Sequence, residues 1–338
     1  MTLHVDDISV SFGSVSVLRS VSLVVDQGER VAIMGPSGTG KSTLLRSIAG
    51  LIHPDTGSIR LDGQDITTSP PHTRKIGLMF QHYALFPHMS VIDNVAYGLR
   101  MHGADASAAR RRAGELLAIV GLADLADRNP SSLSGGEQQR VALARTLAPS
   151  PRVVLLDEPM GSVDNALKDS LMISTIGAID SVGAAAIYVT HDRLEAERFA
   201  DTIGIMRGGS IVRWGSAEDI WHDPQTEFVA DFIGHDNILD VDGPTLGRVL
   251  GPSAAPGRKG VVPIAALQVG LEHRDGHGIE VEGTVASSVF TDGVYRIAVA
   301  TSDDERIIVE SDKRVGQGDQ ITVTLNPEAV RLVAADEL

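Results

Sequence analysis

The pattern of hydrophobic and polar positions divides the chain into two parts. Up to about residue 235, short runs of β-branched and aliphatic residues alternate with amphipathic segments of helical period. Strands are expected at 6–12, 22–26, 30–35, 57–63, 153–157 and 184–191, and helices at 43–51, 104–132, 141–148 and 165–180. Strands that alternate with helices predict a parallel sheet covered by helices, so the first part is expected to be an α/β domain.

The pattern changes after about residue 239 to alternating strands and tight turns. Strands are expected at 279–290, 294–301, 306–311, 320–325 and 329–333, separated by the turn sequences TDG, SDDE and GQGD. Asp-Gly is a strong hairpin signal. We therefore predict an α/β domain over 1–235 and a small all-β barrel or sandwich over 236–338, with 251–260 (GPSAAPGRKG) as a loop inside it.

Composition narrows the classes of function. The chain has 338 residues, of which 43% are hydrophobic, which is enough for the cores of two domains. A net charge of −15 makes nucleic acid a poor partner, and the absence of cysteine excludes disulfides and thiolate metal sites. The start, MTLHVDDISV, lacks the features of a signal peptide, and no apolar run reaches the roughly 18 residues of a membrane span. We expect a cytoplasmic protein whose membrane contacts are made through a partner.

A phosphate-binding loop is predicted between the strand at 30–35 and the helix at 43–51, where the chain reads GPSGTGKS. In the pattern G-x-x-x-x-G-K-[ST], glycines let backbone N–H groups approach phosphates. Lys41 is expected to reach the β- and γ-phosphates, and Ser42 to ligate Mg²⁺ through its hydroxyl. An ordinary glycine-rich turn is the alternative, which this strand–turn–helix context disfavours. The expected nucleotide-binding residues are Gly35, Pro36, Ser37, Gly38, Thr39, Gly40, Lys41, Ser42 and Thr43.

Two acids and a histidine follow buried strands. Asp157 and Glu158 come directly after VVLL, and His191 ends the strand AAAIYVT. The carboxyl ends of strands are where open α/β sheets bind ligands. Asp157 fits a metal-holding role beside Ser42, and Glu158 fits polarisation of the water that attacks the γ-phosphate. His191 is placed to contact that phosphate; a solvated strand end and a packed histidine are the alternatives.

A second anion site is predicted at LSGGEQQR, which leads into the helical pattern VALARTLA. Unpaired N–H groups at a helix start favour an anion, and the small residues Ser134, Gly135 and Gly136 permit its close approach. The alternative is a capping box with Ser134 as N-cap and Glu137 at position N3. Both readings are compatible because the cap leaves other N–H groups free. The chain thus carries two predicted phosphate sites about a hundred residues apart.

The ordered set GPSGTGKS, Gln81, LSGGEQQR, VVLLDE and His191 resembles the nucleotide-binding subunit of an ABC transporter over roughly residues 3–235. The resemblance implies ATP and Mg²⁺ as ligands and a head-to-tail dimer of two copies. Each ATP then lies between the phosphate loop of one copy and Ser134, Gly135 and Gly136 of the other. It further implies that Phe12 stacks on adenine and that Gln81 senses Mg²⁺ and the attacking water.

The sequence departs from this family directly after the two acids. Where many relatives read S-A-L-D, this chain reads Gly161, Ser162, Val163, Asp164. Asp164 is retained, so the resemblance implies that its contact between the two copies survives. These small substitutions bear on how tightly the two ATP sites are coupled.

The segment 81–100 is rich in apolar residues and lies in an expected helical subdomain at about 83–150. An exposed apolar patch marks a partner site, and the resemblance implies that this segment receives a helix of the membrane subunit. The alternative is that these residues belong to the core. From the sequence we favour docking of two membrane-spanning permease subunits here.

The resemblance extends to importers of ferric iron, polyamine and thiamine, whose β-rich tail is an OB-like accessory domain. It implies an ATPase at the cytoplasmic face of the membrane, supplied through the complex by an extracytoplasmic solute-binding protein, with ferric iron as the favoured cargo. One competing hypothesis is a soluble ABC-type ATPase acting on nucleic acid or ribosomes, which the acidic charge and the absence of a coiled coil disfavour. The other is an export ATPase, which the β-rich tail disfavours.

Overall fold

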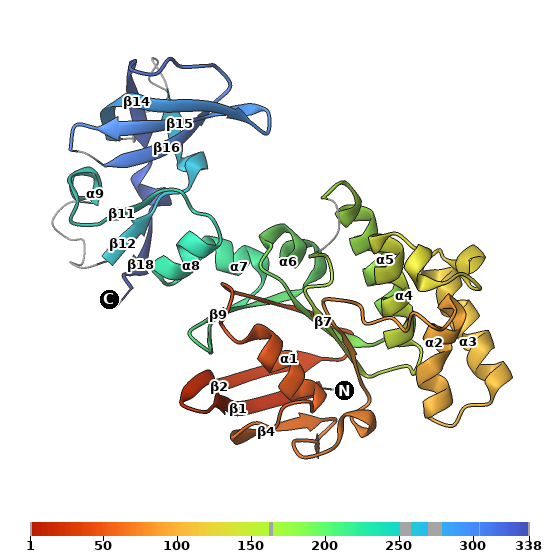
Figure 1. Cartoon of the computed structure of the whole chain (residues 1–338). Coiled ribbons are helices and arrows are strands. Elements are labelled where there is room, and N and C mark those ends of the chain that lie inside the picture. The colour runs from red at the N-terminus through yellow and green to blue at the C-terminus, as the bar shows by residue number, and fades with distance from the viewer. Residues whose placement is uncertain (1, 162–164, 251–257, 270–278, 304, 337–338) are drawn as a thin grey trace. The chain divides into compact units, whose positions relative to one another are not determined.

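The computed structural model describes residues 2–161, 165–250, 258–269, 279–303 and 305–336 (Figure 1). The chain divides into two compact units, Met1–Ala217 and Glu218–Leu338. Each unit has its own sheets and its own hydrophobic core. Among the described helices, none combines the length and the apolar character that crossing a membrane requires.

A six-stranded sheet forms the centre of the first unit. In sheet order, its strands are β10 (Ser210–Gly215), β9 (Thr202–Arg207), β3 (Arg30–Met34), β8 (Ala185–Val189), β7 (Val153–Asp157) and β6 (Ile76–Met79). All neighbours pair in parallel except β10, which is antiparallel to β9. The predicted parallel sheet is therefore confirmed, and the carboxyl ends of β6, β7 and β8 share one edge.

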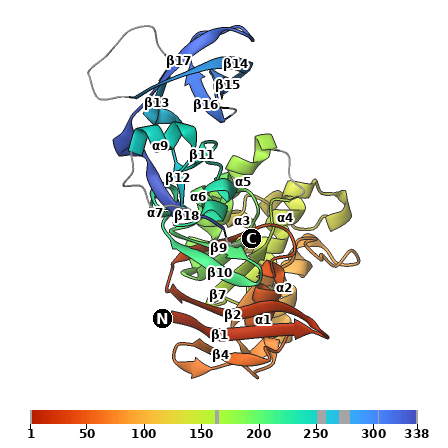
Figure 2. The same ribbon diagram turned by 90° about the vertical axis from the view of Figure 1, so that its left-hand side faces the viewer.

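An antiparallel sheet packs beside this centre (Figure 2). In sheet order, its strands are β2 (Val15–Asp26), β1 (Thr2–Phe12), β4 (Thr56–Leu61) and β5 (Gln64–Asp65). The helix α1 (Lys41–Ala49) lies between the two sheets, because its buried residues Leu44, Leu45 and Ile48 share one core with both.

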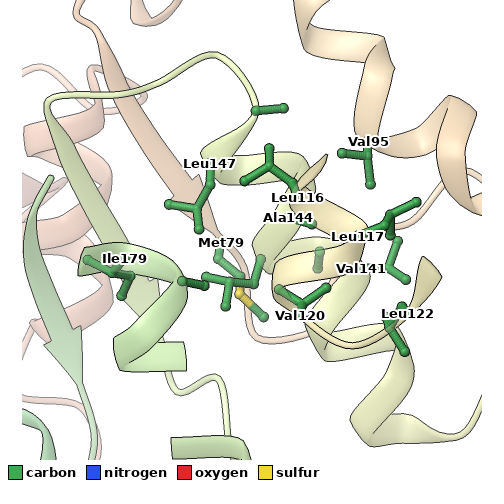
Figure 3. Close-up of a cluster of buried hydrophobic side chains, with 14 of the residues drawn as sticks. Met79, Val95, Leu116, Leu117, Val120, Leu122, Val141, Ala144, Leu147 and Ile179 are labelled. Atoms are coloured by element: carbon green, nitrogen blue, oxygen red, sulfur yellow. The ribbon is translucent and has the colours of Figure 1, made fainter. Parts of the chain in front are cut away.

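The other face of the central sheet is covered by helices. They are α2 (Val91–Met101), α3 (Ala106–Ile119), α4 (Gly135–Leu147) and α5 (Asn165–Val182). Alternate residues of a strand point to opposite faces. Accordingly, Val153 and Leu155 of β7 join the core of α1, whereas Val154 and Leu156 join the core of α4 and α5, part of which is drawn in Figure 3. The helices α1 and α4 thus lie on opposite faces of the sheet.

The helix predicted over 104–132 is shorter than expected. α3 ends at Ile119, and Gly121 follows in the left-handed region with φ 69°. A residue of this conformation commonly terminates a helix, and glycine adopts it without strain. The rest of the segment forms only two single 3₁₀ turns, Ala123–Leu125 and Pro130–Ser132.

A buried arginine closes the end of α1. Arg74 is 1% exposed, and its guanidinium donates to four backbone carbonyls. They belong to Ser47 (3.0 Å), Ile48 (2.9 Å), Thr67 (2.7 Å) and Ser69 (2.9 Å). The last carbonyls of a helix are the negative end of its dipole, so a cation stabilises them. Arg74 thereby fixes the helix whose other end carries the phosphate loop.

The second unit is dominated by antiparallel strands, as predicted. A three-stranded sheet contains β11 (Ile238–Asp240), β12 (Arg258–Val261) and β18 (Arg331–Ala334). A five-stranded sheet contains β13 (Leu267–Val269), β17 (Gln320–Leu325), β14 (Ile279–Thr291), β15 (Val294–Thr301) and β16 (Arg306–Ser311). This arrangement is consistent with an OB-like domain.

Three short helices accompany these strands, namely α7 (Ala217–His222), α8 (Glu227–Phe232) and α9 (Pro244–Leu250). The hairpin expected at TDG is present, with Asp292 and Gly293 at positive φ between β14 and β15. The predicted loop over 251–260 extends too far, because β12 begins at Arg258. Residues 251–257 lie outside the described part of the chain.

Candidate nucleotide site

The phosphate loop joins β3 to α1, and two of its glycines have no room for a side chain. A Cβ on Gly35 would lie 2.5 Å from the carbonyl oxygen of Met206, and one on Gly40 would lie 2.8 Å from that of Val17. Gly40 precedes α1 and supplies no side-chain cap to its first N–H groups. An uncapped helix start with closely wrapped backbone suits a phosphate, so the loop fits the nucleotide that its sequence predicts.

Lys41 is buried and aimed into this loop. Its Nζ donates to the carbonyl oxygens of Gly35 at 2.7 Å and Pro36 at 2.9 Å. Burial lowers the pKa of the Lys41 ammonium, and the nearby charges of Glu158 and Asp157 oppose that shift. The cation is thus held by carbonyl groups at the position where phosphate oxygens are expected.

Ser42 and Asp157 meet at the start of α1. The Ser42 hydroxyl donates to Asp157 Oδ1 at 2.8 Å, and Asp157, the last residue of β7, is only 5% exposed. Burial raises the pKa of the Asp157 carboxyl, and the hydrogen bond from Ser42 opposes that shift. A hydroxyl and a carboxylate at this spacing are oxygen ligands of the kind Mg²⁺ prefers. The donor set therefore fits the metal that the sequence predicts.

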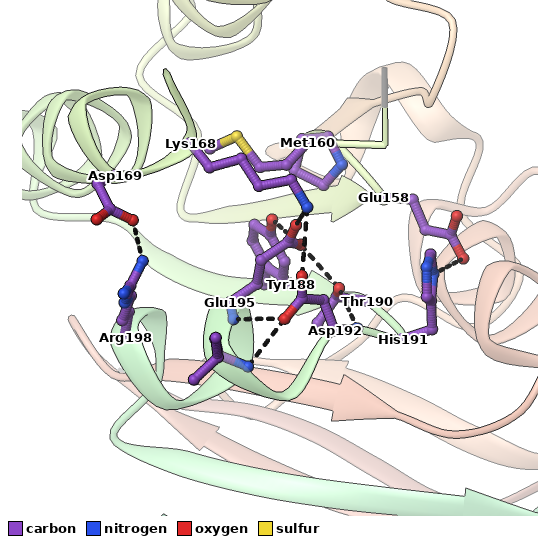
Figure 4. Close-up of polar contacts among 12 residues, drawn as sticks. Glu158, Met160, Lys168, Asp169, Tyr188, Thr190, His191, Asp192, Glu195 and Arg198 are labelled. Atoms are coloured by element: carbon purple, nitrogen blue, oxygen red, sulfur yellow. Dashed lines mark hydrogen bonds and ion pairs between the residues drawn. The ribbon is translucent and has the colours of Figure 1, made fainter. Parts of the chain in front are cut away.

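Three other predicted side chains converge at the same edge of the sheet. Gln81 follows β6, Glu158 follows β7 and His191 follows β8. Gln81 Nε2 donates to Glu158 Oε2 at 3.3 Å, and His191 Nδ1 lies 3.6 Å from Glu158 Oε1, the contact drawn in Figure 4. The Glu158 backbone has φ 45° and donates to the carbonyl of Val189 at 3.0 Å, which turns it away from the direction of β7.

The helix start at LSGGEQQR forms the capping box considered in the sequence analysis. The Ser134 hydroxyl accepts from the Glu137 N–H, and Glu137 Oε2 accepts from the Ser134 N–H at 2.8 Å. Ser134 and Gly135 are exposed. Gly136 packs tightly, since a Cβ there would lie 3.3 Å from Leu171 of α5. The cap and an open helix start therefore coexist.

Two predicted residues stand apart from this cluster. Phe12 ends β1 and is 53% exposed, as stacking on a base requires. Asp164, together with Ser162 and Val163, lies outside the described residues. Gly161 precedes them, and its N–H donates to the carbonyl of Glu158 at 3.2 Å.

The apolar residues of segment 81–100 divide between the core and the surface. Tyr83, Val91, Ile92, Val95 and Ala96 belong to the core that α4 and α5 share. Burial thus accounts for part of the apolar character, and docking of the permease subunits at this segment stays a prediction. The exposed residues of the segment include Gln81, His82, Ala84, Pro87 and His88.

A polar network beside His191 was missed by the sequence analysis. Its side chains come from α5, from the end of β8 and from the start of α6 (Arg193–Phe199), and they are Lys168, Tyr188, Thr190, Asp192 and Glu195 (Figure 4). The sequence holds one signal of it: Asp192, which follows His191 and stands three residues before Glu195, is a typical helix start. No periodicity indicates that Lys168 joins them.

The fold and this site define a P-loop nucleotide-hydrolysing protein of the α/β class. Residues 18–161 match the family model described as "ABC transporter". ATP-binding relatives match most of this chain, and the chain belongs to the ABC transporter family as an ATP-binding ATPase.

Three relatives illustrate this similarity. The Fe(3+) ions import ATP-binding protein FbpC of Streptomyces avermitilis is 46% identical over 78% of this chain and 74% of its own length. The protein of the same name from Streptomyces coelicolor is 41% identical over 98% of this chain and 89% of its own length. The spermidine/putrescine import ATP-binding protein PotA of Frankia alni is 38% identical over 93% of this chain and 75% of its own length.

Proposed function

We propose that this chain is the ATP-hydrolysing subunit of an ABC importer and that two copies work as a head-to-tail dimer. One observation carries the dimer: α1 and α4 pack on opposite faces of the central sheet. Layers packed on a sheet lie roughly 10 Å from it, so these two helices are separated by about 20 Å. A phosphate held at Lys41 is therefore out of reach of Ser134 in the same chain, and LSGGEQQR is free to complete the site of another copy.

In this proposal each ATP is bound by both copies. The loop Gly35–Thr43 holds the phosphates, Phe12 stacks on adenine, and Ser134, Gly135 and Gly136 of the second copy approach the γ-phosphate. Asp164 contributes to the contact between the copies. Ser42 and Asp157 would hold Mg²⁺ and Gln81 would sense it, and the bound ion would supply positive charge to the phosphate oxygens.

Hydrolysis is assigned to the residues at the strand ends. Glu158 accepts a proton from the attacking water, because its carboxylate lies beside the phosphate loop and is oriented by Gln81. His191 contacts the γ-phosphate from the end of β8 and faces Glu158. Closure with ATP and reopening after hydrolysis then shift the dimer between two states.

Import requires partners that this chain does not supply. We propose two membrane-spanning permease subunits, which place the chain at the cytoplasmic face of the membrane, and an extracytoplasmic solute-binding protein that delivers cargo. The names of the relatives as import ATP-binding proteins support this assembly. The docking position near residues 81–100 rests on the family resemblance and on exposed residues such as Ala84 and His88, because five other apolar residues of the segment belong to the core.

Ferric iron is the proposed cargo, supported by relatives named for Fe(3+) import that match most of this chain. Polyamine is the second candidate, because relatives of similar identity are named for spermidine/putrescine import. Thiamine rests on the sequence resemblance alone. Measuring which solute, presented by its binding protein, raises the ATPase rate of the purified native assembly will decide among these cargoes.

The dimer is tested by the mass of Glu158→Gln in solution with and without Mg·ATP. A dimer is expected only with nucleotide, because this variant binds ATP but hydrolyses it slowly. Adding Ser134→Arg should abolish the dimer, since a long cation at the helix start obstructs a partner's phosphate. Ser107→Arg, an exposed serine in the first turn of α3, is the matched control and should leave the dimer intact.

Two results would contradict the proposed dimer. A chain that stays monomeric with ATP bound, as shown by bound nucleotide after gel filtration, would contradict a self-sufficient dimer. A dimer that survives Ser134→Arg would contradict the assignment of LSGGEQQR to the partner's site.

A further inference from the structure

The two residues on either side of His191 are both held by one network. The hydroxyls of Tyr188 and Thr190 each donate to Glu195 Oε2 at 2.8 Å. Lys168 Nζ donates to Glu195 Oε1 at 2.7 Å and to Asp192 Oδ2 at 3.2 Å. Figure 4 shows Lys168 reaching from α5 to both carboxylates. Thr190 is therefore held through Glu195, and Asp192 is held directly.

The centre of this network is withdrawn from solvent, whereas Lys168 and Asp192 at its edge are partly exposed. Tyr188 is fully buried, Thr190 is 2% exposed and Glu195 is 7% exposed. A buried carboxylate is costly unless it is paired and hydrogen-bonded, and here two hydroxyls and one ammonium supply those contacts. The hydrogen bond to Glu195 raises the pKa of Lys168, so the lysine carries its charge at neutral pH.

Asp192 also fixes the direction in which the chain leaves His191. Its Oδ1 accepts from the N–H of Leu194 at 2.9 Å and of Glu195 at 3.3 Å, which caps α6. The His191 side chain itself is 64% exposed and touches Glu158. Because Thr190 and Asp192 restrain the backbone on either side of His191, that backbone orients the exposed His191 ring.

The helix that carries Lys168 also packs on the helix of LSGGEQQR. Leu171, one turn after Lys168 on α5, is buried against Gly136 of α4. α5 thus contacts the start of α4 with one residue and the segment 190–192 with another.

We propose that Lys168 is a positioning residue for ATP hydrolysis. It holds Asp192 directly and Thr190 through Glu195, so that His191 faces Glu158 and the γ-phosphate. This inference rests on the proposed role of His191. A misplacement of about 1 Å at a reacting group costs up to roughly 100-fold in rate, which sets the scale of the effect.

The test is steady-state ATP hydrolysis by the full chain. Lys168→Met should lower kcat about 10- to 100-fold, with the KM for ATP within about twofold, because it disturbs orientation rather than nucleotide binding. Lys168→Arg should restore most of the rate. Glu195→Gln keeps the shape of the side chain but loses its charge, and it should likewise lower kcat with little change in KM. It provides a second variant if Lys168→Met folds poorly.

The matched control is a second ion pair between α5 and α6. Arg198 and Asp169 are both largely exposed, and their pair contacts neither residue beside His191 (Figure 4). Arg198→Gln should therefore keep kcat within about twofold. Equal losses of kcat in Lys168→Met and Arg198→Gln would overturn the proposal, because any loosening of the two helices would then suffice.

A double variant separates this inference from the proposed function. If Lys168 acts through His191, adding Lys168→Met to His191→Ala should slow turnover no further. A further drop by the full factor would overturn the positioning role. A slow His191→Ala with a normal Lys168→Met would also overturn it while leaving the role of His191 intact. Normal turnover of His191→Ala would instead overturn the proposed role of His191, on which the positioning role of Lys168 rests.

Discussion

Glu158 and His191 face each other across the ends of two neighbouring parallel strands, with Glu158 Oε1 3.6 Å from His191 Nδ1. The other carboxylate oxygen of Glu158 accepts from Gln81. Residues at the ends of both adjacent strands thus contact the Glu158 carboxylate. A carboxylate held in this way keeps a defined direction, which general-base catalysis requires.

Replacing Glu158 by Gln is expected to slow ATP turnover by roughly 10²- to 10⁴-fold, because the amide cannot accept the proton of the attacking water. ATP binding should persist, since the phosphate loop is unchanged. Phosphate release and equilibrium nucleotide binding measure the two effects. Glu197→Gln, an exposed carboxylate of α6 paired with Arg193, is the control and should turn over normally. Near-normal turnover in Glu158→Gln would remove Glu158 from its role.

Replacing Lys41 by Ala is expected to weaken ATP binding about 10- to 100-fold. A charge-assisted hydrogen bond contributes roughly 1.5–3 kcal/mol, and each 1.4 kcal/mol is a factor of ten in affinity. Titration with ATP by calorimetry measures the change. Lys313→Ala, at an exposed lysine of the second unit, should bind ATP like the unmodified chain. Unchanged affinity in Lys41→Ala would refute the assignment of the phosphate loop.

Replacing Arg74 by Met is expected to destabilise the first unit by roughly 2–5 kcal/mol, because four carbonyls lose the guanidinium as a donor at once and the contacts at Ser47 and Ile48 are buried. Urea unfolding followed by circular dichroism measures the free energy. Arg60→Met removes an exposed pair with Asp6 and should cost less than about 1 kcal/mol. A loss in Arg74→Met no larger than in Arg60→Met would show that water replaces the guanidinium at these carbonyls.

The phosphate loop and the strand-end acids were predictable because their signals are local. A strand, a glycine-rich turn and a helix follow one another within GPSGTGKS and its flanks, and chain order alone puts Lys41 at a helix start. The capping box of Ser134 and Glu137 was open to sequence reasoning for the same reason, since its two members stand three residues apart. The register of β7 then places Asp157 at the edge of the sheet.

Segment 81–100 shows what sequence reasoning leaves open. Its apolar residues are compatible with a docking surface and with a core, because composition does not reveal what packs against them. Asn94 is fully buried and bonds the carbonyl of Phe86 at 3.0 Å, a contact that folds the loop back onto α2. Neither fact has a signal in the spacing of the segment.

By itself, the sequence determined the class of fold, the division of the chain into an α/β part and a β-rich part, the phosphate loop and the residues at the strand ends. Only the tertiary structure decided that α1 and α4 lie on opposite faces of one sheet, that Arg74 closes α1, and that Lys168 reaches the neighbours of His191. Periodicity and turn signals act over a few residues, whereas these contacts join segments that come together only when several elements have packed. Their partners are chosen by burial and by the need of buried polar groups for hydrogen bonds, and neither can be read from spacing along the chain.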